Sequence, residues 1–222
     1  MSNSNEPFSD PQAVARYAEG PRRIVPGFHD LHRMTTLLLA ERAPQSAHML
    51  VLGAGGGLEL KTFAETHPDW TFTGIDPSLE MLQLAEKTLV SYKNRIHLHH
   101  GYLADAPQER YDGATCLLTL HFVPREERRQ IAADLHHRLK PGAPLVVAHL
   151  SFPQDPDQKT LWYERYLAFS DTKDSELNRA AFESRLNILS PAEDESVLRE
   201  AGFSEINLFY SGFAFRGWVA HA

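Results

Sequence analysis

Residues 47–58 read AHMLVLGAGGGL, an apolar run that leads directly into closely spaced glycines. The apolar part, 47–52, has the pattern of a strand that is buried on both faces, as in a parallel sheet. Glycine lets the backbone turn sharply and lets a ligand approach it with no Cβ in the way. The stretch therefore predicts a strand followed by a tight turn at which a ligand can bind.

An aspartate stands at the matching place on the next predicted strand. Residues 70–75 form an apolar run, and Asp76 ends it. Asp76 follows Gly53 at close to the ~20 residues at which nucleoside-binding sheets place the carboxylate that holds the ribose hydroxyls. The glycine turn and Asp76 together predict a ligand that contains adenosine.

The glycine spacing bears on which adenosine cofactor is bound. The dinucleotide fingerprint G-x-G-x-x-G needs a third glycine at its last position. That position is Leu58 when the motif is counted from Gly53, and Leu60 when it is counted from Gly55. The stretch instead reads G-x-G-x-G after a strand. An NAD oxidoreductase is therefore the least favoured class.

Composition narrows the class of protein further. The chain has 222 residues, of which 42% are hydrophobic and 23% charged, as expected of one globular domain. No apolar run approaches the ~18 residues of a membrane span, and residues 1–10 resemble no signal peptide, so a cytoplasmic location without membrane association is expected. The net charge of −7 and the lack of a basic stripe give no support to nucleic-acid binding. The single Cys116, in an apolar run, predicts a buried thiol and no disulfide within the chain.

The rest of the chain alternates between helical and strand patterns up to about residue 150. Helical spacing covers residues 28–42, 79–89 and 124–139, and strand patterns cover 96–98, 114–122 and 145–150. This alternation predicts a doubly wound, mostly parallel α/β sheet.

The carboxyl-terminal third follows a different pattern. Residues 157–187 read as two helices with no strand between them, and Ser190, Pro191 and Glu193 form a capping box that begins another helix. Strands over 203–210 and 213–220, joined through residues 211 and 212, predict an antiparallel hairpin at the sheet edge. We expect one domain over 1–222, with a helical cap (1–45), a cofactor-binding core (46–150), a helical lid (151–189), and a last helix and hairpin (190–222).

Residues 14–220 resemble the class I S-adenosylmethionine-dependent methyltransferases. The resemblance is carried by the G-x-G-x-G turn with Asp76, by residues 24–28 (IVPGF), and by 119–122 (TLHF) with the following 126–128 (EER). It is closest to the branch that contains the carboxy-S-adenosylmethionine synthase of tRNA wobble-uridine modification. The resemblance implies a Rossmann-like seven-stranded sheet with an antiparallel last strand, and S-adenosylmethionine as cofactor, with S-adenosylhomocysteine as its product.

The resemblance also assigns cofactor-binding residues. Gly53, Ala54 and Gly55 would wrap the methionine part, and Asp76 would hold the ribose. The remaining positions would lie against the adenine or the sulfonium: Phe28, Pro77, Met81, Tyr102, Leu103, Leu117 and Thr119.

Some positions depart from the family pattern. Val51 stands where an acid usually precedes the first glycine, and Tyr102 stands where an aspartate usually meets the adenine. Asp105 could substitute for that aspartate, or the Tyr102 ring could stack on the adenine. The synthase branch carries an arginine for its extra carboxylate, and Arg179 and Arg185 are both candidates.

In-line displacement at an activated methyl group needs alignment, exclusion of water and, for a protonated acceptor, one base. His121, just past the fourth strand, is the candidate base or substrate contact, and His149 is a second candidate. The alternative is that His121 is a half-buried structural histidine.

Two further patterns leave alternatives open. Aromatic residues 162, 163, 166 and 169 read as a lid over the substrate, or else as core or a homodimer contact. The histidines at 97, 99, 100, 136 and 137 lack the spacing of metal ligands, so no metal is expected.

The favoured function is methyl transfer from S-adenosylmethionine to a small-molecule acceptor. The alternatives are a carboxy-S-adenosylmethionine synthase-like enzyme and a non-catalytic module that binds the cofactor. The identity of the acceptor cannot be inferred from the sequence.

Overall fold

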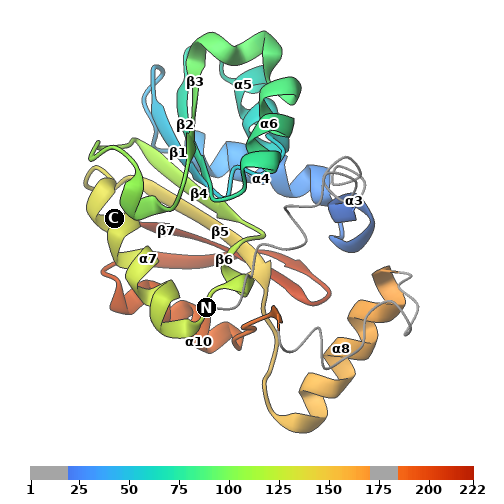
Figure 1. The fold of residues 1–222 in the computed structure, drawn as a ribbon. Helices are drawn as coiled ribbons and strands as arrows, with labels where there is room; N and C mark the ends of the chain where they lie inside the picture. The colour runs from blue at the N-terminus through green and yellow to red at the C-terminus, as the bar shows by residue number, and fades with distance from the viewer. Residues whose placement is uncertain (1–19, 171–184) are drawn as a thin grey trace.

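The computed structural model describes residues 20–170 and 185–222 (Figure 1). Seven strands form one sheet in the order β3-β2-β1-β4-β5-β7-β6. They are β1 (His48–Leu52), β2 (Thr71–Asp76), β3 (Ile96–His100), β4 (Gly113–Leu117), β5 (Pro144–Leu150), β6 (Ser204–Gly212) and β7 (Phe215–His221). The helices are α3 (Gly20–Ile24), α4 (Phe28–Ala40), α5 (Leu58–Thr66), α6 (Leu79–Thr88), α7 (Arg125–Arg138), α8 (Pro156–Ser170) and α10 (Pro191–Glu200).

The sheet has the predicted mixed topology. Strands β1 to β5 pair in parallel, and β7 inserts antiparallel between β5 and β6. The chain order reverses at β1, which lies between β2 and β4. Open α/β sheets bind ligands outside the carboxyl ends of their strands at such a switch point. The glycine turn after β1 begins at this place.

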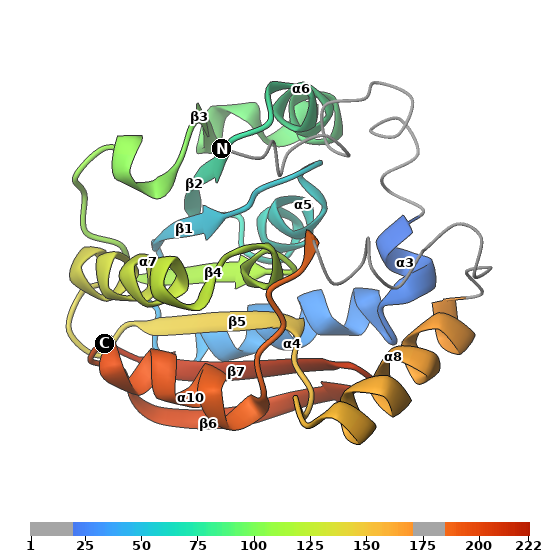
Figure 2. The ribbon, with the colours of Figure 1, turned by 60° about the horizontal axis from the view of Figure 1, so that its bottom comes forward.

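Helices lie on both faces of the sheet (Figure 2), and a buried apolar cluster lies on each face. One contains apolar residues of α4, α5 and α8, and the other contains residues of α7 and α10. Trp70 belongs to the first cluster and Trp218 to the second, and both side chains are almost completely buried. Because both faces are covered, the central strands are apolar throughout rather than alternating.

Local signals of the sequence set several helix ends. Ser78 caps α6 by accepting a hydrogen bond from the Met81 amide at 3.1 Å. Ser190 and Glu193 form the predicted capping box at the start of α10. The second helix expected between residues 157 and 187 falls largely outside the described residues.

The fourth strand is shorter than predicted. It ends at Leu117 rather than at residue 122, because Leu118 takes a left-handed conformation with φ 56°. The chain then forms a 3-10 turn, η3 (Leu120–Phe122), which carries His121.

The turn of the final hairpin is also displaced from its predicted place. Residues 211 and 212 belong to β6, and the chain reverses at Phe213 and Ala214 instead. Phe213 has a φ of 50°, a conformation that a bulky side chain rarely adopts.

Candidate functional site

The glycine turn has the backbone conformation that its sequence predicts. Gly53, Gly55 and Gly57 have φ values of 77°, 47° and 78°. A Cβ at Gly53 would lie 2.1 Å from the Thr119 hydroxyl oxygen, so no larger residue fits there without a shift of its neighbour. The Gly53 and Ala54 amides both donate to the Ile75 carbonyl at 2.9 Å. The turn is therefore held against the end of β2.

Asp76 fixes the same turn through its side chain. Its Oδ2 accepts a hydrogen bond from the Gly55 amide at 2.9 Å, and its Oδ1 accepts one from the Ser78 amide at 2.9 Å. Burial raises the pKa of Asp76, although these two hydrogen bonds oppose the rise. Each carboxylate oxygen has a second lone pair and can accept one more hydrogen bond. Asp76 therefore retains the capacity to accept further hydrogen bonds while it holds the turn, and its contact with the ribose stays a prediction.

The residues predicted around the adenine surround the end of β2. The Gly101 amide donates to the Asp76 carbonyl at 3.1 Å, which brings the loop after β3 next to Asp76. Met81 and Leu103 are buried, whereas the Tyr102 side chain is 63% exposed. The Asp105 carboxylate accepts from the Tyr102 amide at 2.9 Å. Whether Asp105 or the Tyr102 ring meets the adenine stays a prediction.

Strained backbone follows β4, opposite the glycine turn. Leu118 has its left-handed conformation here, and its amide donates to the Ala148 carbonyl at 2.6 Å. The Thr119 hydroxyl donates to the Leu117 carbonyl at 3.0 Å and meets Gly53 from the other side. Strain of this kind is concentrated at ligand sites. Leu118 was missed as a special position because a leucine gives no signal of positive φ.

Phe28 lies at the start of α4 and is buried. Its ring packs edge to face on His32 at 4.4 Å between centroids, and burial lowers the pKa of His32 to about 4. Phe28 shares a buried cluster with Ala54 and Leu117. A contact between Phe28 and the cofactor stays a prediction.

His121 is buried rather than half-buried. Its Nδ1 accepts from the Leu150 amide at 3.4 Å, and its side chain lies at the carboxyl ends of β4 and β5. Burial, aided by His149 and Arg128, holds the pKa of His121 well below its ordinary value. The imidazole is therefore neutral at neutral pH.

A buried ionic network that sequence reasoning missed lies behind His121. Oδ1 of Asp194 is 2.5 Å from Nη1 of Arg128 and 3.0 Å from Nε2 of His149. Arg128 also donates to the Asn187 carbonyl at 2.6 Å. Although burial raises the pKa of Asp194, His149 and Arg128 more than compensate and lower it overall. His149, the second candidate base, is thereby part of a network that joins β5, α7 and α10.

The aromatic stripe of α8 divides into two pairs. Tyr163 and Tyr166 are buried in the core, and burial raises the pKa of Tyr166 to about 12. Trp162 is half-buried, and Phe169 is 38% exposed. The lid role of these aromatic residues stays a prediction, and Trp162 and Phe169 are the two whose rings reach the surface.

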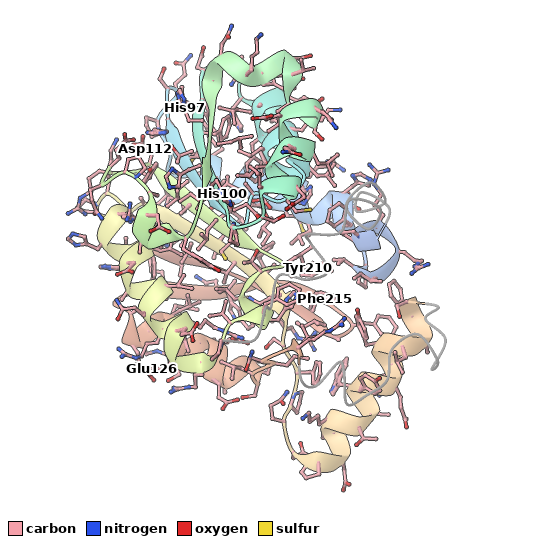
Figure 3. The ribbon with its side chains drawn as sticks, in the orientation of Figure 1. His97, His100, Asp112, Glu126, Tyr210 and Phe215 are labelled. Atoms are coloured by element: carbon pink, nitrogen blue, oxygen red, sulfur yellow. The ribbon has the colours of Figure 1, made fainter. Side chains whose placement is uncertain are left out.

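The described ranges contain no group of three or more His, Cys, Asp or Glu side chains arranged to hold a metal ion. His97 and His100 lie at different levels along β3 (Figure 3). None of the helices within these ranges is long and apolar enough to cross a bilayer. Cys116 is fully buried, and burial raises the pKa of its thiol.

Comparison with known proteins places this geometry in a family. Residues 49–142 match the family described as "Methyltransferase domain". The carboxy-S-adenosyl-L-methionine synthase of Chromohalobacter salexigens is 30% identical over 224 residues, which cover 95% of this chain and 82% of that protein. The synthase of Marinobacter nauticus is 26% identical over 97% of this chain and 90% of that protein.

Solved structures agree on the fold. Magnesium protoporphyrin IX methyltransferase from Synechocystis PCC 6803, with bound S-adenosylhomocysteine, superposes with a TM-score of 0.71 at 17% identity, covering 98% of this chain and 97% of that one. Human N-acetylserotonin methyltransferase in complex with S-adenosylmethionine has a TM-score of 0.66 at 15% identity, covering 100% of this chain and 59% of that one. The chain belongs to the carboxy-S-adenosyl-L-methionine synthase family and has the fold of the class I S-adenosylmethionine-dependent methyltransferases.

Proposed function

We propose that this protein binds S-adenosylmethionine at the carboxyl ends of β1, β2 and β4 and directs transfer of its methyl group to a small-molecule acceptor. The observation that carries the proposal is the bond from the Gly55 amide to Asp76, which assembles the glycine turn and the carboxylate into one site. Solved relatives of the same fold hold S-adenosylmethionine or S-adenosylhomocysteine.

The residues present fit that cofactor. The Cβ-free backbone at Gly53 and Gly55 suits the methionine part, and Asp76 has lone pairs for the ribose. The exposed Tyr102 ring and the buried Met81 and Leu103 side chains give the adenine a polar-edged apolar environment. These assignments rest on the resemblance together with the placement of the residues around Asp76.

When bound, the cofactor supplies a methyl carbon on a positively charged sulfur, whose C–S bond breaks as a lone pair of the acceptor attacks. The chain then has to align the acceptor and keep water out. His121 is neutral because of its lowered pKa, and its Nδ1 accepts from the Leu150 amide, so its Nε2 carries the proton and can donate a hydrogen bond to the acceptor. Of the two roles expected for His121, base or acceptor contact, the proposal therefore uses the acceptor contact.

The test is calorimetric titration of the protein with S-adenosylhomocysteine. We expect saturable binding in the wild type and at least tenfold weaker binding in Asp76→Asn, since charge-assisted hydrogen bonds contribute about 1.5–3 kcal/mol. Equal affinity of both proteins would overturn the placement of the ribose, and absence of binding would overturn the proposal.

A second candidate function is formation of carboxy-S-adenosylmethionine, in which the cofactor's methyl group gains a carboxylate. It is favoured by the name of the 30% identical relative that covers 95% of the chain. Arg185 is exposed, and Arg179 lies outside the described residues, so the choice between them stays open. Mass spectrometry of the cofactor that copurifies with the protein distinguishes the two functions, because the added carboxylate increases the mass.

Three further expectations belong to the same proposal. Tight binding of S-adenosylhomocysteine without turnover on any acceptor would indicate a non-catalytic module. A cytoplasmic location is inferred from composition alone. A homodimer through the aromatic face of α8 would show as a doubled mass in sedimentation.

A further inference from the structure

Two arginine side chains share one tryptophan ring at the lid. The Cζ atom of Arg165, one turn along α8, lies 4.7 Å from the centroid of Trp162. The Cζ atom of Arg216, on β7, lies 5.3 Å from the same centroid. Two guanidinium groups from distant parts of the sequence therefore lie against a single half-buried indole.

Neither arginine has an acidic partner among residues 20–170 and 185–222. Arg216 donates only through Nη1, to the Phe213 carbonyl at 2.5 Å and the Phe215 carbonyl at 2.8 Å. Within these ranges its Nε and Nη2 have no hydrogen-bond acceptor. Partial burial lowers the pKa of Arg216, yet the side chain remains a cation at any physiological pH. Arg165 and Arg216 thus place two positive charges at one ring, and no carboxylate of the described residues neutralises them. Such a pair of charges attracts an anionic ligand.

Two exposed aromatic rings lie beside these cations. Phe169 of α8 and Phe213 of the hairpin are 38% and 49% exposed, and their ring centroids are 5.1 Å apart. Phe213 directly follows β6 and has a φ of 50°, a strained backbone conformation for a residue with a bulky side chain. The exposed ring is therefore held by strained backbone. The cations and the rings together suit a ligand with an anionic end and an apolar body.

This place is at the same edge of the sheet as the glycine turn. In the β5–β7 pair, Leu150 lies opposite Phe215 and His149 opposite Arg216, at the carboxyl end of β5. The Tyr210 hydroxyl donates to the Pro26 carbonyl at 2.6 Å, which ties the hairpin to the chain that enters α4. Tyr210 and Phe215 lie at this end of the hairpin, between α3 and α8 (Figure 3). The acceptor of a methyl group has to approach from this edge.

We propose that five residues bind the acceptor and select an organic acid with a flat apolar ring. They form the arginine–aromatic surface, which consists of Trp162, Arg165, Phe169, Phe213 and Arg216. The two guanidinium groups attract the carboxylate, and the ring lies against Phe169 and Phe213. This inference rests on the proposed function and adds the chemical class of its substrate.

The test uses benzoate as the probe and benzamide, its uncharged counterpart, as the matched ligand. The protein is saturated with S-adenosylhomocysteine, and tryptophan fluorescence is followed during titration. Trp70 and Trp218 are 2% and 0% exposed, so a change caused by a surface ligand reports on Trp162. We expect saturable quenching by benzoate and at least tenfold weaker quenching by benzamide.

Variants locate the binding site. Arg216→Gln and Arg165→Gln should each weaken benzoate binding at least tenfold, because each removes one charged donor pair. Arg199→Gln is the control: Arg199 is an exposed arginine of α10 that lies 3.9 Å from Glu195 and should bind benzoate as the wild type does. Equal binding of benzoate by wild type and Arg216→Gln would overturn the inference. So would equal binding of benzoate and benzamide.

Two further arms separate this inference from the proposed function and from simple anion binding. The benzoate titration is repeated without S-adenosylhomocysteine, so that failure to bind the cofactor and failure to bind the acid are read separately. Inorganic phosphate is the second anion. Phosphate that binds as tightly as benzoate would overturn the role of the ring, and much weaker phosphate binding would support it.

Discussion

The backbone amide of Gly55 donates a hydrogen bond of 2.9 Å to Oδ2 of Asp76, which joins the turn after β1 to the end of β2. Asp76 thereby serves two purposes, since the same carboxylate positions the turn and faces the proposed ribose. A change at Asp76 should affect cofactor binding and the order of the glycine turn together.

Asp76→Ala should therefore lose more stability than Asp76→Asn. The asparagine keeps one side-chain oxygen as an acceptor, whereas alanine leaves the Gly55 and Ser78 amides without partners, at about 1–3 kcal/mol for each such buried group. Urea unfolding should show a clear stability loss for Asp76→Ala and a smaller one for Asp76→Asn. Equal unfolding midpoints would contradict the structural half of this relationship.

Gly53→Ala tests the close approach of Thr119. The new Cβ would lie 2.1 Å from the Thr119 hydroxyl oxygen, and the residue would keep a φ of 77°. Gly142→Ala is the matched control, because Gly142 has a similar φ of 75° but no atom within 4 Å of the added Cβ. Gly142→Ala should lower the free energy of unfolding by about 1–2 kcal/mol, because an alanine in the left-handed conformation is strained. Thermal melting should show a larger loss for Gly53→Ala, and identical losses would argue that Thr119 moves away at no cost.

Much of this site could be predicted because its signals are local. Gly53, Gly55 and Asp76 are marked by spacing after strands, and Ser78 and Ser190 by cap chemistry. Leu118 and Phe213 could not be predicted, since leucine and phenylalanine normally avoid positive φ. Their conformations are imposed by tertiary contacts such as the bond from the Leu118 amide to the Ala148 carbonyl.

The network of Arg128, Asp194 and His149 could not be predicted from the sequence for a related reason. Its members come from α7, α10 and β5, and no periodicity connects them. An arginine and an aspartate on helices usually indicate exposed faces. Only the packing of α7 against α10 shows that both side chains are almost completely buried.

Arg128→Met and Asp194→Asn should each be strongly destabilising. Removing one partner of a buried ion pair leaves the other charge uncompensated, which typically costs about 3–5 kcal/mol. The double variant should cost less than the sum of the two single variants. The control is Arg129→Met, which removes an exposed pair with Glu126 and should change the urea midpoint little. Additive losses in the double-mutant cycle would contradict direct coupling between Arg128 and Asp194.

His121→Ala should lower turnover on the acceptor while the affinity for S-adenosylhomocysteine stays unchanged. The reason is that the neutral imidazole is proposed to act on the acceptor. His67→Ala is the control: its half-buried ring lies in the α5–β2 connection, before the amino end of β2, and stacks on Trp70. Unchanged turnover in His121→Ala would identify His121 as a structural residue. A loss of cofactor affinity would place it against the cofactor instead.

Glu59 gives the protein a pH dependence of stability with a definite sign. Glu59 lies in the first turn of α5 and is buried, and it accepts a hydrogen bond of 2.7 Å from the Thr115 hydroxyl. Burial raises the pKa of Glu59 to about 8 from its ordinary value of 4.5. Between these two values the folded protein keeps a proton that the unfolded chain releases, so stability falls as pH rises from 4.5 to 8.

Glu59→Gln should therefore be more stable than the wild type at pH 8, because glutamine is neutral at every pH and its amide oxygen can still accept from Thr115. The advantage should decrease toward pH 4.5, where Glu59 is protonated in both states of the wild type. The gain would appear as a melting temperature higher by several degrees, since about 1 kcal/mol corresponds to ~2–4 °C in a protein of this size. Glu65→Gln, at an exposed position of the same helix, should show no such difference. A pH-independent effect of Glu59→Gln would mean that Glu59 is ionised in the folded protein, with water or a cation beside its carboxylate.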